Sequence, residues 1–269
     1  MRLGAARYSG FSLVEIAVVL VIIAILATAI GVPLASQLDQ QKTKDTEKQL
    51  EAVKEAIYGF AMANGRLPCP ASATSYGAEA FAGSGSAADG DCSSTSGWVP
   101  AATLGLTPVD SNGFMQDGWA DGTTARRLRY AVSKVKYEPG APAPTGCPAT
   151  LTYPLTKTNG IKGATMGCLS DAAVNLLTVV TTTINNVPAG CTPSNLTTKA
   201  PFVIFSLGKN GTTGGTGADE AQNVAKDATT FVSHTPTPSG NCAGEFDDIV
   251  TWGSLNTLFA RMVQAGKLP

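Results

Sequence analysis

The chain is poor in the residues on which most catalytic sites depend. Of its 269 residues only one is a histidine, and charged residues make up 14% of the total. A triad of the serine or cysteine protease kind could be built only around His234, which lies in a loop-like stretch without a patterned nucleophile. The Gly208-Lys209 pair lacks the residue order of a phosphate-binding P-loop. We therefore expect no enzyme activity.

Charge of either sign is also scarce. The formal net charge is −1, so we expect no general nucleic-acid binding by a basic face. The 29 glycines and 16 prolines instead suit an extracellular, β-rich domain with long loops. The length beyond an N-terminal anchor is sufficient for one hydrophobic core.

Cysteines are few, and none forms a C-x-x-C pair, which argues against a zinc site. An even number of cysteines in an exported domain predicts up to three disulfides. The sequence leaves the pairing open, and we favour Cys69–Cys92, which would close the base of the loop between them. The six candidates are Cys69, Cys92, Cys147, Cys168, Cys191 and Cys242.

One long apolar run stands out against this background. Between residues 11 and 35, Glu15 is the only charged residue. The run is long enough for a membrane-spanning helix, and a carboxylate inside hydrocarbon is costly enough to need a partner and a purpose. Arg2 and Arg7 precede the run, which predicts a single-pass anchor with its N-terminus in the cytoplasm.

The sequence Gly-Phe-Ser-Leu-Val-Glu at the start of this run resembles the signal of type IV pilins and type II secretion pseudopilins. The resemblance implies that residues 1–10 are a leader peptide, which prepilin peptidase removes by cutting between Gly10 and Phe11. It also implies methylation of the new amine on Phe11, and pairing of Glu15 with the amine of a neighbouring subunit during assembly.

An ordinary secretory signal, cut after Ala27-Thr28-Ala29, is an alternative reading of the same region. Glu15 is unusual inside such a signal, and the sequence continues as a helix beyond Ala29. Both features favour the prepilin interpretation.

Beyond the apolar run the sequence becomes amphipathic, with Leu50, Val53 and Ile57 at helical spacing. Asn64-Gly65 then predicts a helix stop. We therefore predict one spine helix over residues 11–64.

The predicted fold class is α+β, a pilin-like lollipop. The spine helix would cross the membrane over residues 11–35, and its second half would pack on a head formed by residues 65–269. This head would be a C-terminal antiparallel β-sheet with long loops. The predicted strands and final helix are 127–132, 151–155, 176–184, 201–207 and 254–266.

Two segments near the C-terminus, 205–211 and 246–252, resemble the ending S-x-G-x-D-G…D-D-I-x-x-W of major pseudopilins, whose loop binds calcium. The resemblance implies a structural Ca²⁺ held by Asn210, Asp247 and Asp248, whose oxygen ligands suit that ion. In this chain Asn210 stands where an aspartate is usual, and a longer insertion separates the segments. A solvated turn or a helix-capping pair is the alternative for the two aspartates.

The resemblance implies a structural subunit, stored in the bacterial inner membrane with a periplasmic head and then assembled into a type IV pilus-type filament. Its partners would be prepilin peptidase, other pilin subunits, and an assembly platform with its ATPase. Two alternatives remain open: a minor pilin that acts as a tip adhesin or binding module, and a pseudopilin of a type II secretion system in a periplasmic pseudopilus.

Overall fold

The computed structural model describes residues 10, 12–137, 146–148, 150–185, 191–213, 215 and 217–268 of the chain. The side chains of residues 27–35 are also outside the description. Two compact units are present, residues 1–42 and 43–269, and each is treated by itself. The second unit begins within the spine helix, and the predicted division into leader, spine helix and head stays a prediction.

The elements follow one another along the chain as a long helix, then short strands and helices. They are α1 (Leu13–Asn64), β1 (Ser96–Trp98), α2 (Ala101–Leu104), η1 (Thr124–Arg126), β2 (Arg129–Val132), β3 (Lys136–Tyr137), β4 (Leu151–Thr152), α3 (Gly160–Gly163), α4 (Met166–Ser170), β5 (Leu177–Val180), β6 (Asn195–Ala200), β7 (Phe202–Ser206), η3 (Gly211–Thr213), α5 (Ala218–Val224), β8 (Thr230–Val232), β9 (Ile249–Trp252) and α6 (Leu255–Gln264).

Helix α1 contains 52 residues and corresponds to the predicted spine. It ends where Gly65 adopts a φ of 70°, the left-handed conformation that favours glycine after a helix. Within the part of the chain that is described, no helix is long and apolar enough to cross a membrane. The predicted span at 11–35 includes Phe11 and the side chains of 27–35, which lie outside the described residues, so the span stays a prediction.

A four-stranded antiparallel sheet, in the order β1-β2-β7-β9, forms the centre of the second unit. Together with α1 it gives the predicted α+β class, with a helix packed on an antiparallel sheet. Strand β7 is buried along its whole length, as its Phe-Val-Ile-Phe-Ser sequence indicates.

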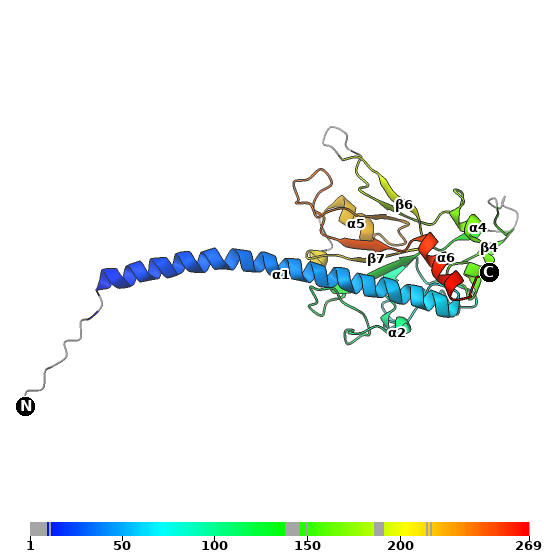
Figure 1. Ribbon diagram of the computed structural model, residues 1–269, viewed down its shortest axis with the longest axis horizontal. Coiled ribbons are helices and arrows are strands. Elements are labelled where there is room, and N and C mark those ends of the chain that lie inside the picture. The colour runs from blue at the N-terminus through cyan, green and yellow to red at the C-terminus, as the bar shows by residue number, and fades with distance from the viewer. Residues whose placement is uncertain are drawn as a thin grey trace, which may run out of the picture. The chain divides into compact units, whose positions relative to one another are not determined.

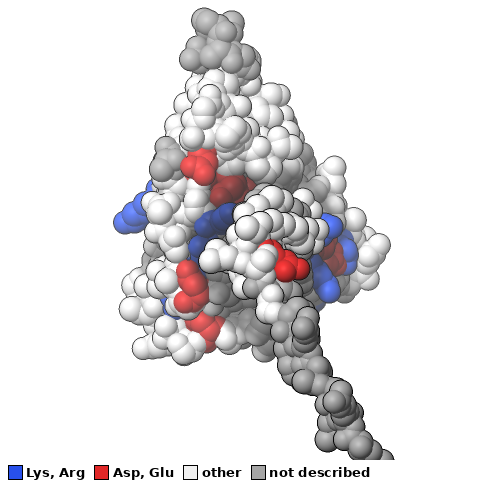
Figure 2. Space-filling model, turned by 90° about the vertical axis from the view of Figure 1, so that its left-hand side faces the viewer, with Lys and Arg blue, Asp and Glu red and all other residues white. Residues whose placement is uncertain are grey.

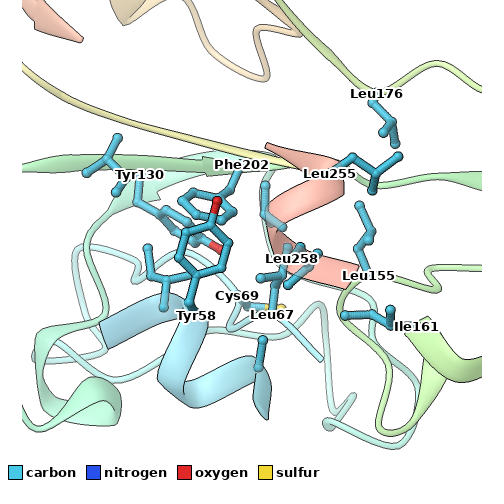
Figure 3. Close-up of a cluster of buried hydrophobic side chains, with 14 of the residues drawn as sticks. Tyr58, Leu67, Cys69, Tyr130, Leu155, Ile161, Leu176, Phe202, Leu255 and Leu258 are labelled. Atoms are coloured by element: carbon cyan, nitrogen blue, oxygen red, sulfur yellow. The ribbon is translucent and has the colours of Figure 1, made fainter. Parts of the chain in front are cut away.

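One face of this sheet packs on the second half of α1. Tyr130 and Phe202 project from β2 and β7, and the Phe202 ring meets the ring of Tyr58 from α1 edge to face at 5.4 Å. Leu255 and Leu258 of α6 complete the cluster (Figure 3). The apolar stripe of the second half of α1 is therefore core.

The opposite face carries a second apolar cluster, in which Val203 and Phe205 of β7 pack with Leu177, Val179 and Phe231. The last three belong to a three-stranded sheet in the order β6-β5-β8. Its β5–β8 pair is parallel, an arrangement that needs a long crossover, and here β6, β7 and α5 lie between them in the chain. Strands β3 and β4 form a separate antiparallel pair.

The C-terminal helix α6, red in Figure 1, lies beside α1 within the second unit. The backbone N–H of Ser254 donates to the Tyr58 hydroxyl at 3.0 Å, and Arg261 donates to Glu55 at 3.0 Å. On the face shown in Figure 2, acidic and basic side chains stand in small groups within a mostly uncharged surface.

Candidate functional site

The N-terminal end of α1 is closed by a reciprocal cap. The Ser12 N–H donates to Glu15 Oε2 at 3.5 Å, and the Glu15 N–H donates to Ser12 Oγ at 3.2 Å. This is the capping-box arrangement that a Ser-x-x-Glu sequence favours. Gly10 and Glu15 are exposed, whereas Phe11 lies outside the described residues.

Apolar side chains surround this end of the helix and are exposed within the first unit. Leu13 is 87% exposed and Val14 72%, values far from those of a core. The other large exposed side chains of this stretch are Ile16, Val18, Val19, Leu20, Val21, Ile22, Ile23, Ile25 and Leu26. An exposed apolar surface of this size is typical of a segment that contacts lipid or another protein.

A second constellation lies in the second unit, where three carboxylates from separate segments converge. Glu220 comes from α5, and Asp247 and Asp248 come from the segment before β9. One oxygen of each carboxylate lies within 4.8 Å of the others. Glu220 was not among the predicted ligands, because it belongs to the insertion that separates the two motif segments.

Asn210, another of the predicted ligands, is hydrogen-bonded to this cluster. Its backbone N–H donates to Asp247 Oδ2 at 3.0 Å, and its Nδ2 donates to Glu220 Oε1 at 2.9 Å. The Oδ1 of Asn210 is buried and has no hydrogen-bond partner among the described residues. Asp248 faces a different amide, since its Oδ2 accepts from Asn223 at 2.8 Å.

The two aspartates of the cluster hold a proton more tightly than an ordinary aspartate does. Burial, helped by Glu220 and Glu245, raises the pKa of Asp247 to about 6. Burial, together with Glu220 and Asp247, also raises the pKa of Asp248 well above its ordinary value. Like charges that are packed this closely favour either a bound proton or a bound cation.

Two glycines let the backbone approach the carboxylates. A Cβ on Gly208 would lie 2.2 Å from Asp247 Oδ1, and a Cβ on Gly215 would lie 2.2 Å from Glu220 Oε2. Both glycines have positive φ angles. The orphaned amide oxygen, the three carboxylates and this close backbone form a donor set that fits Ca²⁺.

An arginine holds the loop beside this cluster. Arg126 donates to the carbonyl oxygens of Gly208 at 2.6 Å and Lys209 at 3.0 Å. Nearby, the Ser206 hydroxyl donates to the buried carboxylate of Asp117 at 2.6 Å. The turn at Asp117-Gly118-Trp119 is thereby tied to Ser206 at the end of β7, a connection that the sequence did not predict.

The cysteines form three disulfides in the structure. Cys69 pairs with Cys92, the pair that the sequence argument favoured, with a Cα–Cα distance of 5.3 Å. The other two pairs are Cys147–Cys168 and Cys191–Cys242, with Cα–Cα distances of 4.5 and 6.0 Å.

The single histidine, His234, has contacts with Thr235, Asp219 and Phe246. The ring of His234 stacks on that of Phe246 with 3.9 Å between centroids. Its Nε2 is 3.6 Å from Asp219 Oδ2, a buried carboxylate whose other oxygen accepts from Thr183.

Comparison with known proteins identifies the N-terminal region. Residues 6–31 match the family model described as the prokaryotic N-terminal methylation motif, the signature of prepilin-like proteins of the type IV pilin and pseudopilin kind. The matched range contains Gly10, Phe11 and Glu15. No curated protein and no solved structure matches the chain significantly.

Proposed function

We propose that the chain is a structural subunit that is cut between Gly10 and Phe11, methylated on Phe11, and assembled into a type IV pilus-type filament. The observation that carries this proposal is the methylation motif over residues 6–31. The motif supports a pilin-like or pseudopilin protein that prepilin peptidase processes. Other pilin subunits, the inner membrane, and an assembly platform with its ATPase are the further partners.

The geometry around Glu15 supports its proposed role in assembly. Its carboxylate is exposed in the first turn of α1 and accepts a long hydrogen bond, of 3.5 Å, from the Ser12 N–H. Cleavage frees an amine on Phe11. The amine of a neighbouring subunit would give Glu15 an ion pair inside an apolar bundle, where charge pairing is strongest.

The exposed apolar side chains of residues 13–26 support a subunit that is held first in the inner membrane and then in a filament. Hydrocarbon covers them while the subunit waits in the inner membrane with its head in the periplasm. Helices of neighbouring subunits cover them after assembly, in the pilus or in a periplasmic pseudopilus.

The test is an intact mass and an N-terminal peptide map of the protein from its native membrane. We expect a chain that begins at N-methylated Phe11, and the full precursor from Met1 in a strain without prepilin peptidase. A chain that begins at Ile30 would show an ordinary secreted protein. A chain that begins at Met1 in the wild-type strain would leave an uncut anchor and overturn the proposal.

The acidic cluster favours one second candidate, a pseudopilin with structural Ca²⁺. Glu220, Asp247, Asp248 and the Oδ1 of Asn210 would hold the ion, which would offset the repulsion among three carboxylates and fix the loop before α5. A sound test is thermal unfolding of the full chain in detergent micelles with CaCl₂, with MgCl₂, and with neither.

For this calcium site we expect CaCl₂ to raise the melting temperature. A ligand whose free concentration is about 100 times its Kd stabilises the folded state by about 2.7 kcal/mol. Glu220→Gln should remove most of that increase, and Asp89→Asn, at an exposed loop residue, should leave it intact. An equal response to CaCl₂ and MgCl₂, or an undiminished response in Glu220→Gln, would argue against the site.

The role within the filament is separable by two observations in cells. Immunogold labelling along the shaft indicates a major subunit, and labelling only at tips indicates a minor pilin that acts as a binding module. Loss of enzyme secretion on deletion, with surface pili unchanged, indicates the pseudopilin.

A further inference from the structure

A cavity of about 310 Å³ opens on the face of the four-stranded sheet that lies away from α1. Trp98, Arg129 and Phe205 stand opposite one another on β1, β2 and β7, so their side chains project from the same face. The neighbouring residues of β2 show which face this is, because Tyr130 belongs to the core with α1. The opposite wall includes Val224 of α5 and Lys226 just after it.

Arg129 is the unusual residue of this cavity. Its Nε is buried without a hydrogen-bond partner, and its guanidinium makes no ion pair with any described residue. Its neighbours differ, since Arg127 pairs with Asp110 at 2.7 Å and Arg126 with Asp121 at 3.3 Å. Arg129 is half-buried, and a cation that is partly withdrawn from water without an ion pair favours a counter-charge.

The charges around Arg129 do not supply that partner. Asp248 acts on it electrostatically, but the Asp248 carboxylate is hydrogen-bonded to Asn223. Arg127 and Lys226 add positive charge. Burial, followed by Arg127, lowers the pKa of Arg129, which reflects the same lack of compensation.

A second donor in the cavity lining also lacks an acceptor. The indole Nε1–H of Trp98 is buried and has no partner among the described residues. The guanidinium of Arg129 lies over the same indole ring, 5.2 Å from its centroid. The hydroxyls of Ser94 and Ser96 also line the cavity, and Ser94 donates to Asp227.

We propose that this cavity binds the carboxylate of a small organic acid. A planar guanidinium pairs with a carboxylate through two parallel hydrogen bonds, and the Trp98 N–H is a further donor. The apolar side chains of Phe205 and Val224 suit the organic body of the ligand, and the volume is that of a small ligand site. The Asp227 carboxylate at Ser94 disfavours a doubly charged phosphate.

This binding site concerns the head alone and is independent of which filament the chain enters. It would make the head a receptor for an acidic sugar or an amino-acid-like acid. Both classes of ligand carry a carboxylate. Titration with one probe of each class distinguishes them.

The experiment is isothermal titration calorimetry of the full chain in detergent micelles at matched ionic strength. The probes are sodium glucuronate, N-acetylglycine, neutral glucose and inorganic phosphate. We expect saturable binding of at least one carboxylate at one site and none of glucose. In Arg129→Gln the affinity should fall about tenfold or more, because the charge-assisted pair between guanidinium and carboxylate is lost.

Arg261→Gln is the matched control, because Arg261 is a surface arginine that is paired with Glu55. Its affinity should equal that of the wild type. If Arg129→Gln does not fold, Trp98→Phe takes its place, with an expected loss of several-fold. Binding of phosphate alone, no saturable binding of either carboxylate, or an equal loss in Arg261→Gln would overturn the proposal.

Discussion

The two units of this chain use the same helix in opposite ways. Between residues 13 and 26, α1 exposes its apolar side chains, and Ile16 is 52% exposed. Between residues 50 and 61, the same helix buries them, and Ile57 is fully buried. The first stretch therefore has a sequence suited to surroundings other than this chain, whereas the second is explained by contacts within the chain.

The largest expected effect is on stability, when one isoleucine from each of the two stretches of α1 is replaced by alanine. Ile57→Ala should lower the free energy of unfolding by about 2–5 kcal/mol, since it leaves a cavity in the main hydrophobic core. Ile16→Ala should change it little, because Ile16 makes no part of that core. Denaturant unfolding of the full chain in micelles, followed by near-ultraviolet circular dichroism, measures both. Equal losses in the two variants would contradict the division into two units.

The same contrast explains what could be predicted from the sequence. Helix α1 was predicted because its signals are local: an apolar run, a 3.6-residue stripe and a glycine stop. Strand β6 was missed because Asn195–Ala200 is mostly exposed and has little apolar alternation. Strands β8 and β9 are short and owe their pairing to distant partners, which periodicity does not reveal.

The candidate sites divide in the same way. The motif around Glu15 is contiguous and was recognised directly. Asn210 and Asp247 came from a resemblance to known sequences; the backbone N–H of Asn210 donates to Asp247, and their role as calcium ligands stays a prediction. Glu220 reaches the cluster only through the fold of the insertion, and the unpaired state of Arg129 exists only in three dimensions.

A smaller effect, confined to assembly, is expected from matched glutamates on α1. Glu15→Ala should leave cleavage after Gly10 largely intact and reduce filament yield about tenfold or more, because the proposed ion pair between subunits would be lost. Glu47→Ala, at an exposed residue of the second unit, should leave the yield unchanged. Quantitative blotting of sheared filaments, with mass spectrometry of the membrane fraction, measures both steps. Normal filament yield from Glu15→Ala would remove the role proposed for this carboxylate.

The smallest expected effect concerns an acid that the second unit buries, in contrast to the exposed Glu15. Asp117 is 2% exposed, and burial raises its pKa despite the hydrogen bonds from Ser206 and Trp119. A raised pKa in the folded state means that the folded protein holds this proton more tightly than the unfolded chain does. The contribution to stability is therefore fully present below the unfolded pKa of about 4 and is lost as the pH rises through the folded value.

Asp117→Asn removes this titration while keeping a side chain that can hydrogen-bond to Ser206, whose hydroxyl can donate or accept. Relative to the variant, the wild type should lose a few degrees of melting temperature between pH 4 and neutral pH. Asp89→Asn, in an exposed loop, should follow the wild type across the same range. The difference in melting temperature between the wild type and Asp117→Asn could instead be the same at every pH. That result would mean that the hydrogen bonds to Asp117 compensate its charge fully, so that ionisation of the buried acid costs no stability. The contrast between the two units would then rest on apolar burial alone.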